Sequence, residues 1–262
     1  MDLGIADKVA LVAASSKGIG LAIAEELAAN GARLVMCARG EDALRASAEK
    51  IRSSGAEVLD VVADVSRPDD IARLTAAAIR KFGRVDILVS NSGGPPAGAF
   101  EGLTAEMWAD AARLLLHSTV EMVRAVLPGM KERRWGRILN VTSIAAKQPV
   151  DGLMLSNSLR AAVHGFARTL ANEVAPYGIT VNNILPGYTR TDRVISLAKH
   201  ASETKGITID ESYKTWEEQV PMGRLAEPRE IAAVAAFILS ERASYLTAGS
   251  IAVDGGWIRS LM

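Results

Sequence analysis

Short apolar segments rich in β-branched residues recur along the whole chain, separated by longer stretches with helical spacing. This alternation is typical of successive β-α-β units, whose strands lie parallel and whose helices cover both faces of one sheet. It predicts a doubly wound α/β fold with seven parallel strands. The expected strands are residues 9–13, 34–38, 58–62, 85–89, 138–142, 180–185 and 251–253.

The 262 residues contain no internal repeat and no linker rich in proline, glycine or serine, so we expect a single domain. Residues 192–220 are polar and weakly periodic, and we expect them to be irregular. Ligands of open α/β sheets bind beyond the carboxyl ends of the strands, and this segment follows the sixth expected strand. We therefore predict a substrate lid at 192–220, with a surface insertion as the alternative.

The charge balance and the cysteine count exclude several classes of protein. Thirty basic residues match thirty acidic ones, which argues against nucleic acid or an anionic membrane surface as a partner. Cys37 is the only cysteine, no apolar segment reaches the roughly 18 residues of a membrane span, and the N-terminal residues do not resemble a secretion signal. We expect a cytoplasmic protein without a metal site, because no His, Cys and Asp residues show ligand spacing.

A glycine-containing turn connects the first expected strand to a helix. Backbone N–H groups in such a turn, together with the helix N-terminus, can bind a pyrophosphate. The six-residue Rossmann fingerprint is incomplete because Ile23 replaces its third glycine, and Ala14 is expected to need a negative φ. The residues predicted to hold the nucleotide phosphates are Ser15, Ser16, Lys17, Gly18, Ile19 and Gly20.

Two cations indicate which nucleotide is bound. Where a carboxylate after the second strand would select the ribose hydroxyl of NAD, this chain has Arg39. A guanidinium suits the 2′-phosphate of NADP, and Lys17 in the turn adds a second positive charge. We predict NADP(H) as the cofactor.

In this position the turn resembles the TGxxxGxG motif of the short-chain dehydrogenase/reductase family, with Ala13 and Ala14 in place of its threonine and first glycine. The resemblance extends over nearly the whole chain and implies a Rossmann-type domain that transfers hydride between a nicotinamide and a carbonyl or alcohol. It also implies a homotetramer, with a homodimer as the alternative, since the 253–257 segment resembles the family's closing strand. Further residues that it assigns to cofactor binding are Asp64 and Val65, Asn91 and Gly93 of an NNAG-like motif, and Pro186, Gly187 and Thr191 of a PGxxxT motif.

The family's catalytic residues match only in part. Ser143 falls at the position of the serine that polarises the substrate oxygen, whereas Ser156 replaces the proton-donating tyrosine and Arg160 the lysine four residues later. The resemblance then implies two roles for Arg160, one in the catalytic site and one in binding the cofactor ribose. Leu115 falls at the asparagine of the water relay. The resemblance therefore implies a divergent relative of the 3-oxoacyl-carrier-protein reductases that lacks the YxxxK motif.

Another group must supply the proton if the site is redox-active. Tyr188 is the best candidate, because a neighbouring cation could lower its pKa, although packing under the lid is the alternative. Lys147 is a second candidate, while His117 and His164 are expected to be packing residues. The leading hypothesis is an NADP(H)-dependent oxidoreductase acting on a small ketone, alcohol or 3-oxoacyl thioester. The alternatives are a cofactor-binding pseudoenzyme or sensor and, last, non-redox chemistry like that of the halohydrin dehalogenases.

Overall fold

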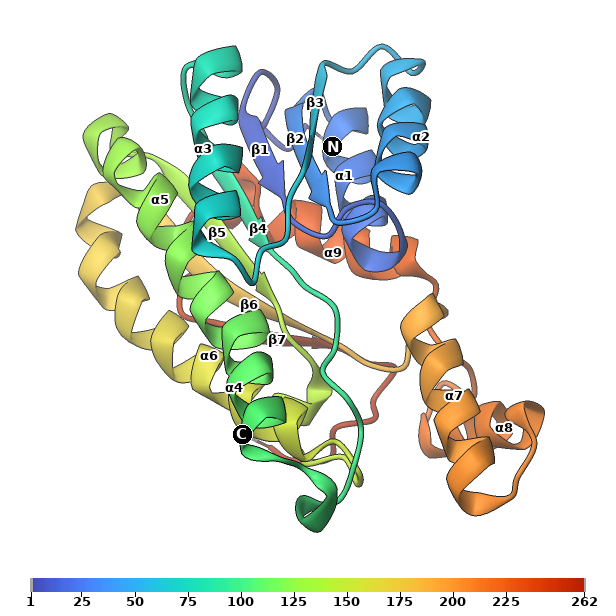
Figure 1. Ribbon diagram of the computed structural model, residues 1–262. Helices are drawn as coiled ribbons and strands as arrows, with labels where there is room; N and C mark the ends of the chain where they lie inside the picture. The colour runs from blue at the N-terminus through green and yellow to red at the C-terminus, as the bar shows by residue number, and fades with distance from the viewer. Residues whose placement is uncertain (1, 262) are drawn as a thin grey trace.

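A computed structural model describes residues 2–261, without the side chains of residues 204 and 205. One seven-stranded sheet has the order β3-β2-β1-β4-β5-β6-β7, and every pair of neighbouring strands is parallel (Figure 1). The predicted fold class is confirmed, and the expected strand ends differ from the observed ones by no more than two residues. The strands are β1 (Val9–Val12), β2 (Arg33–Ala38), β3 (Val58–Val62), β4 (Ile87–Ser90), β5 (Gly136–Val141), β6 (Ile179–Pro186) and β7 (Ser250–Val253).

Helices cover the sheet on both faces, as the apolar alternation requires. Side chains of α1 (Gly18–Ala29), α2 (Glu41–Arg52) and α9 (Pro228–Ile238) share one buried apolar cluster with alternate strand residues. The opposite face packs against α3 (Pro68–Phe82), α5 (Ser118–Arg133) and α6 (Met154–Val174). A short helix, α4 (Ala105–Ala112), precedes α5. The sheet is therefore buried on both sides and leaves its carboxyl-end edge for ligands.

The strand order fixes where a ligand can bind. After β1 the chain builds outward through β2 and β3, and it then returns to place β4 on the other side of β1. The loops that follow β1 and β4 consequently leave the sheet in opposite directions and open a crevice at their carboxyl ends. The glycine turn and the loop that begins at Asn91 both lie at this crevice.

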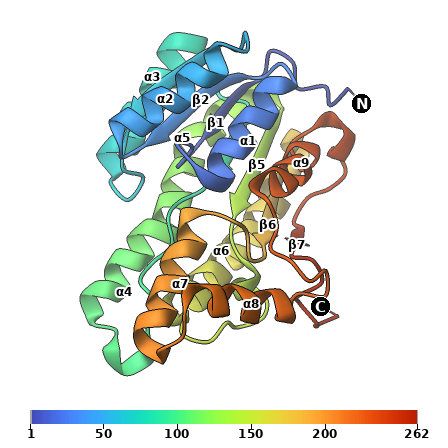
Figure 2. The same cartoon turned by 90° about the vertical axis from the view of Figure 1, so that its right-hand side faces the viewer.

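The segment 192–220 is helical, so the irregular structure expected there is wrong. It forms α7 (Asp192–Lys205) and α8 (Ile209–Gln219), which contact each other and project from the body of the domain (Figure 1 and Figure 2). Gly206 ends α7 with a φ of 66°, and a capping box between Thr208 and Glu211 begins α8. Val194 and Ala198 are buried four residues apart on α7, whereas much of α8 is polar and exposed, which explains the weak periodicity.

No helix in the described part of the chain is both long and apolar enough to cross a membrane. Within residues 2–261, no three His, Cys, Asp or Glu side chains come together as a metal site would require.

Candidate active site

A cleft of about 670 Å³ opens at the carboxyl ends of the strands. This volume lies in the range of small-molecule and cofactor sites. The structure brings almost all of the sequence-predicted site residues together here. Those that line the cleft are Ser16, Lys17, Gly18, Ile19, Gly20, Arg39, Asp64, Val65, Asn91, Gly93, Ser143, Ser156, Arg160, Pro186, Gly187, Tyr188 and Thr191.

Two glycines let the turn after β1 pack closely on its neighbours. Gly18 has a φ of 60°, and a Cβ there would lie 3.3 Å from Cγ2 of Thr191. A Cβ on Gly20 would lie 2.3 Å from the carbonyl oxygen of Ala14 and 2.8 Å from Nδ2 of Asn91. Ala14 itself has a φ of 48°, so the negative φ expected for it is wrong. The tight turn holds an alanine in the left-handed region that glycine adopts without strain.

Ser15 does not line the cleft, which corrects its assignment to the cofactor site. Its side chain is fully buried, its N–H donates to the carbonyl oxygen of Cys37 (3.0 Å), and its Oγ accepts from the N–H of Cys37 (3.1 Å). The side chain therefore ties the end of β1 to β2. It positions the turn rather than a ligand.

The cations predicted to select NADP are both exposed at one end of the cleft. Arg39 lines it directly after β2. Lys17 Nζ lies 2.5 Å from Oδ2 of Asp192 at the start of α7, with 68% and 66% of the two side chains exposed. This exposed ion pair is weak, so a phosphate can compete for the lysine. Oδ1 of Asp64 accepts from the N–H and hydroxyl of Ser66, and Oδ2 has no hydrogen-bond partner among the described residues.

Ser143, Ser156 and Arg160 lie together at the other end of the cleft. Ser143 Oγ accepts from the N–H of Ala145 (3.1 Å) and begins a short 3-10 turn after β5. Arg160 Nε donates to Oγ of Ser156 (3.2 Å), as expected for residues one helical turn apart on α6. Neither hydroxyl donates in any hydrogen bond among the described residues. Both serines therefore retain an O–H that can donate to a ligand oxygen.

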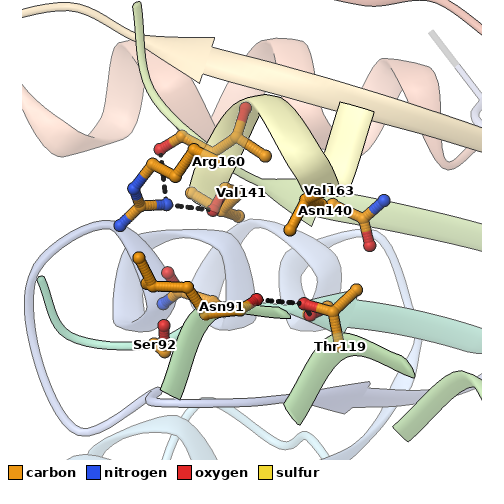
Figure 3. Close-up of a pocket in the computed structure, with 10 residues that line it drawn as sticks. Asn91, Ser92, Thr119, Asn140, Val141, Arg160 and Val163 are labelled. Carbon is orange, nitrogen blue, oxygen red and sulfur yellow. Dashed lines mark hydrogen bonds between the residues drawn. The ribbon is translucent and has the colours of Figure 1, made fainter. Parts of the chain in front are cut away.

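The Arg160 guanidinium is anchored to the end of β5. Its Nη1 donates to the carbonyl oxygens of Val141 (3.0 Å) and Thr142 (2.9 Å), and Figure 3 shows it reaching over Val141 toward the Asn91 loop. Burial, with a smaller contribution from the positive charge of Arg193, lowers the pKa of Arg160 to about 10. The group stays charged at neutral pH and cannot pass a proton along as a lysine can.

Tyr188 packs against α8 rather than serving as a ready proton donor. Its ring stacks on Trp216 of α8 at 5.1 Å between centroids and meets Trp257 edge-on at 6.2 Å. Burial, with a smaller effect of the Asp151 carboxylate, raises the pKa of Tyr188 to about 12. The expectation that a cation would lower this pKa is therefore wrong.

The remaining candidates have structural roles or lie outside the cleft. Lys147 is exposed and does not line it, and His117 is exposed on a π-helical turn. His164 Nε2 lies 2.9 Å from Oγ1 of Thr142, whose hydroxyl donates to Ile184. The imidazole is then the donor to Thr142. Burial, with the charges of Lys147 and Arg160, lowers the pKa of His164 to about 4, so the ring is neutral.

Leu115 lies in the π-helical turn Arg113–His117 between α4 and α5. It lines a small pocket of about 10 Å³, roughly the size that one water needs. Asn140 and Arg160 line the same pocket (Figure 3). Oδ1 of Asn140 is buried without a hydrogen-bond partner among the described residues.

Comparison with known proteins identifies the family of this site. The profile of a family described as enoyl-(acyl carrier protein) reductase matches residues 13–258. A putative ketoacyl reductase of Streptomyces coelicolor is 36% identical over 251 residues, which cover 95% of this chain and 96% of that protein. The chain belongs to the short-chain dehydrogenase/reductase family.

Two further relatives of this short-chain dehydrogenase/reductase support the assignment. The 3-oxoacyl-[acyl-carrier-protein] reductase of Vibrio cholerae is 36% identical over 254 residues, which cover 97% of this chain and 98% of that one. The crystal structure of L-sorbose reductase from Gluconobacter frateurii, complexed with NADPH and L-sorbose, is similar with a TM-score of 0.95 at 36% identity, and each chain is covered completely.

Sequence reasoning missed one residue that lines the cleft and two that pack behind it. Arg193 lines it and donates from Nη2 to the carbonyl oxygen of Pro95 (2.7 Å). Trp216 and Trp257 hold Tyr188 in place from two distant parts of the chain. Arg193 stands only two residues after Thr191 of the recognised motif, so that spacing could have drawn attention to it. The tryptophans gave no comparable signal.

Proposed function

We propose that this chain is an NADP(H)-dependent oxidoreductase that reduces a ketone or 3-oxoacyl thioester, or oxidises the corresponding alcohol, at a divergent site. The observation that carries the proposal is the cluster of Ser143, Ser156 and Arg160 at the same cleft as the glycine turn. Loss of the reduced-nicotinamide absorbance on mixing the protein with NADPH and a panel of carbonyl compounds tests it. Absence of turnover across the panel would contradict it.

The residues of the cleft fit a dinucleotide. Gly18 and Gly20 allow the tight turn whose backbone N–H groups would meet a pyrophosphate at the N-terminus of α1, and Arg39 lies where a 2′-phosphate would need a cation. The other residues proposed to hold it are Ser16, Lys17, Ile19, Asp64, Val65, Asn91, Gly93, Arg160, Pro186, Gly187 and Thr191. When bound, the nicotinamide supplies a hydride to a carbonyl carbon or removes one from an alcohol.

In this proposal Ser156 and Arg160 stand in place of the family's tyrosine and lysine. Ser143 and Ser156 donate to the carbonyl oxygen, where negative charge develops during reduction. Arg160 donates to Oγ of Ser156, which polarises that hydroxyl and places a fixed positive charge beside it. Because Tyr188 is buried with a raised pKa, we assign the final proton to water that enters the cleft.

The nucleotide preference is tested by changing Arg39 to aspartate. We expect the dissociation constant of NADPH to rise about 10- to 100-fold, since hydrogen bonds to charged groups contribute about 1.5–3 kcal/mol, while NADH binds no more weakly. Calorimetric titration of both nucleotides measures this. Arg45→Asp, an equal charge change at an exposed residue of α2 outside the cleft, is the control. Equal losses in the two variants would show that Arg39 does not contact the phosphate.

A cofactor-binding pseudoenzyme or sensor is the second candidate function. It is favoured by the engagement of the Arg160 guanidinium with the carbonyl oxygens of Val141 and Thr142 and by the raised pKa of Tyr188. The double variant Ser156→Tyr with Arg160→Lys discriminates. If wild-type protein is inactive and the double variant reduces carbonyl compounds, the substrate pocket is intact and the second function holds.

The assembly and location stay predictions. We propose a homotetramer, or else a homodimer, in the cytoplasm, with a small-molecule substrate and with neither nucleic acid nor a membrane as partner. The family resemblance of residues 253–257 and the balanced charge of the chain support these proposals. The proposed substrate lid at 192–220 is supported by the cleft-lining side chains of α7.

A further inference from the structure

Two guanidinium groups lie at the end of the cleft that holds Ser143 and Ser156, without a carboxylate partner. Arg160 and Arg193 both line it, and no carboxylate of the described residues lies within ion-pair distance of either. The two are close enough for the charge of Arg193 to act on Arg160. An unpaired, partly buried charge is unfavourable, and two like charges in one cleft increase the cost.

The acidic residues that line the cleft are engaged elsewhere. Asp64 accepts two hydrogen bonds from Ser66 at the end near Arg39, and Asp192 pairs with Lys17. Asp151 acts on Tyr188 but is exposed and does not line the cleft. No carboxylate that lines the cleft therefore balances the two arginines, and an anionic ligand could do so.

Arg193 is held in place for such a ligand. Its Nη2 donates to the carbonyl oxygen of Pro95, and its guanidinium packs directly on Gly94. A Cβ on Gly94 would lie 2.6 Å from Nε of Arg193, so the glycine makes room for this side chain. No other hydrogen bond of Arg193 occurs among the described residues. Its remaining N–H groups can bind an oxyanion through two parallel hydrogen bonds.

We propose that the substrate of this site is an oxo acid, or the matching hydroxy acid, whose carboxylate is bound by Arg193. This inference rests on the proposed function, because it names the substrate class of the same cleft. The pyrophosphate of the cofactor is assigned to the glycine turn, so Arg193 remains for the substrate. Arg160 adds positive potential at the same end while it holds Ser156.

Binding of matched ligands tests the inference without requiring turnover. The protein is saturated with NADP⁺ and titrated by calorimetry with linear oxo acids that differ in the number of carbons between ketone and carboxylate, each compared with its methyl ester. For at least one spacing, we expect the acid to bind about 10- to 100-fold more tightly than its ester, the range of charged hydrogen bonds. In Arg193→Met, a side chain of similar length without charge, the ratio is expected to approach one.

Two further variants separate charge, geometry and fold. Arg193→Lys keeps the charge without the planar fork and is expected to give an intermediate ratio. Arg229→Met removes an exposed arginine of α9 outside the cleft and is expected to keep the wild-type ratio. Thermal unfolding of each variant reports whether the domain is intact.

Two outcomes would overturn the inference. One is equal binding of acid and ester to the wild type at every spacing. The other is weaker NADP⁺ binding by Arg193→Met with an unchanged acid-to-ester ratio, which would assign the guanidinium to a cofactor phosphate. Acid preference in binding without hydride transfer would instead contradict the proposed function and leave the carboxylate site standing.

Discussion

Replacing Gly20 with alanine is expected to weaken NADPH binding about 5- to 150-fold and to lower the free energy of unfolding by about 1–3 kcal/mol, the usual cost of overpacking. The added Cβ would lie 2.3 Å from a backbone oxygen of Ala14, so the turn itself must move. Calorimetry and chemical denaturation measure the two effects. The backbone N–H groups that we propose to bind the pyrophosphate are expected to shift with the turn.

Gly165→Ala is the matched control for this change. Gly165 is exposed in α6, and a Cβ there meets no atom within 4 Å. The variant is expected to keep wild-type NADPH affinity and to gain up to about 1 kcal/mol from helix propensity. NADPH binding by the Gly20 variant with wild-type affinity would show that the cofactor does not use this turn.

Ser143→Ala is expected to reduce kcat by about 100- to 1000-fold while leaving the NADPH dissociation constant unchanged. The reason is that the variant removes one of the two O–H donors assigned to the substrate oxygen. Steady-state kinetics with the best carbonyl substrate measures the loss. Wild-type kcat in this variant would place charge stabilisation on another group.

The capping role of Ser143 is separated from catalysis by two controls. Its Oγ also accepts from the N–H of Ala145, so the alanine variant loses about 1 kcal/mol of local stability. Ser143→Thr keeps a hydroxyl for both tasks and is expected to restore much of the activity. Ser158→Ala, at an exposed position of α6 outside the cleft, is expected to have no effect on kcat.

The fold could be predicted from the sequence because burial on both faces leaves a clear apolar pattern. Strand residues such as Val9 to Val12 are all buried, and the glycine turn follows them directly. The helices at 192–220 were missed because few of their side chains are buried, so apolar periodicity is weak. The capping box of Thr208 and Glu211 was a local signal that could have revealed α8.

The site was predicted as a set of positions but not as a set of contacts. Helical spacing was enough to place Ser156 beside Arg160. The buried orientation of Ser15 depends on its hydrogen bonds to β2, and the φ of Ala14 depends on the packing of the turn. The raised pKa of Tyr188 depends on burial under α8. Such tertiary effects leave no mark in local sequence.

Transfer of deuterium from NADPH labelled at the hydride position tests the central claim most directly. Wild-type protein is incubated with labelled NADPH and the carbonyl panel, and the products are analysed by mass spectrometry. We predict an alcohol product carrying one deuterium atom, formed at a strongly reduced rate by the Ser143→Ala variant. Tight NADPH binding without deuterium in any product would contradict the claim that this divergent site carries out redox chemistry.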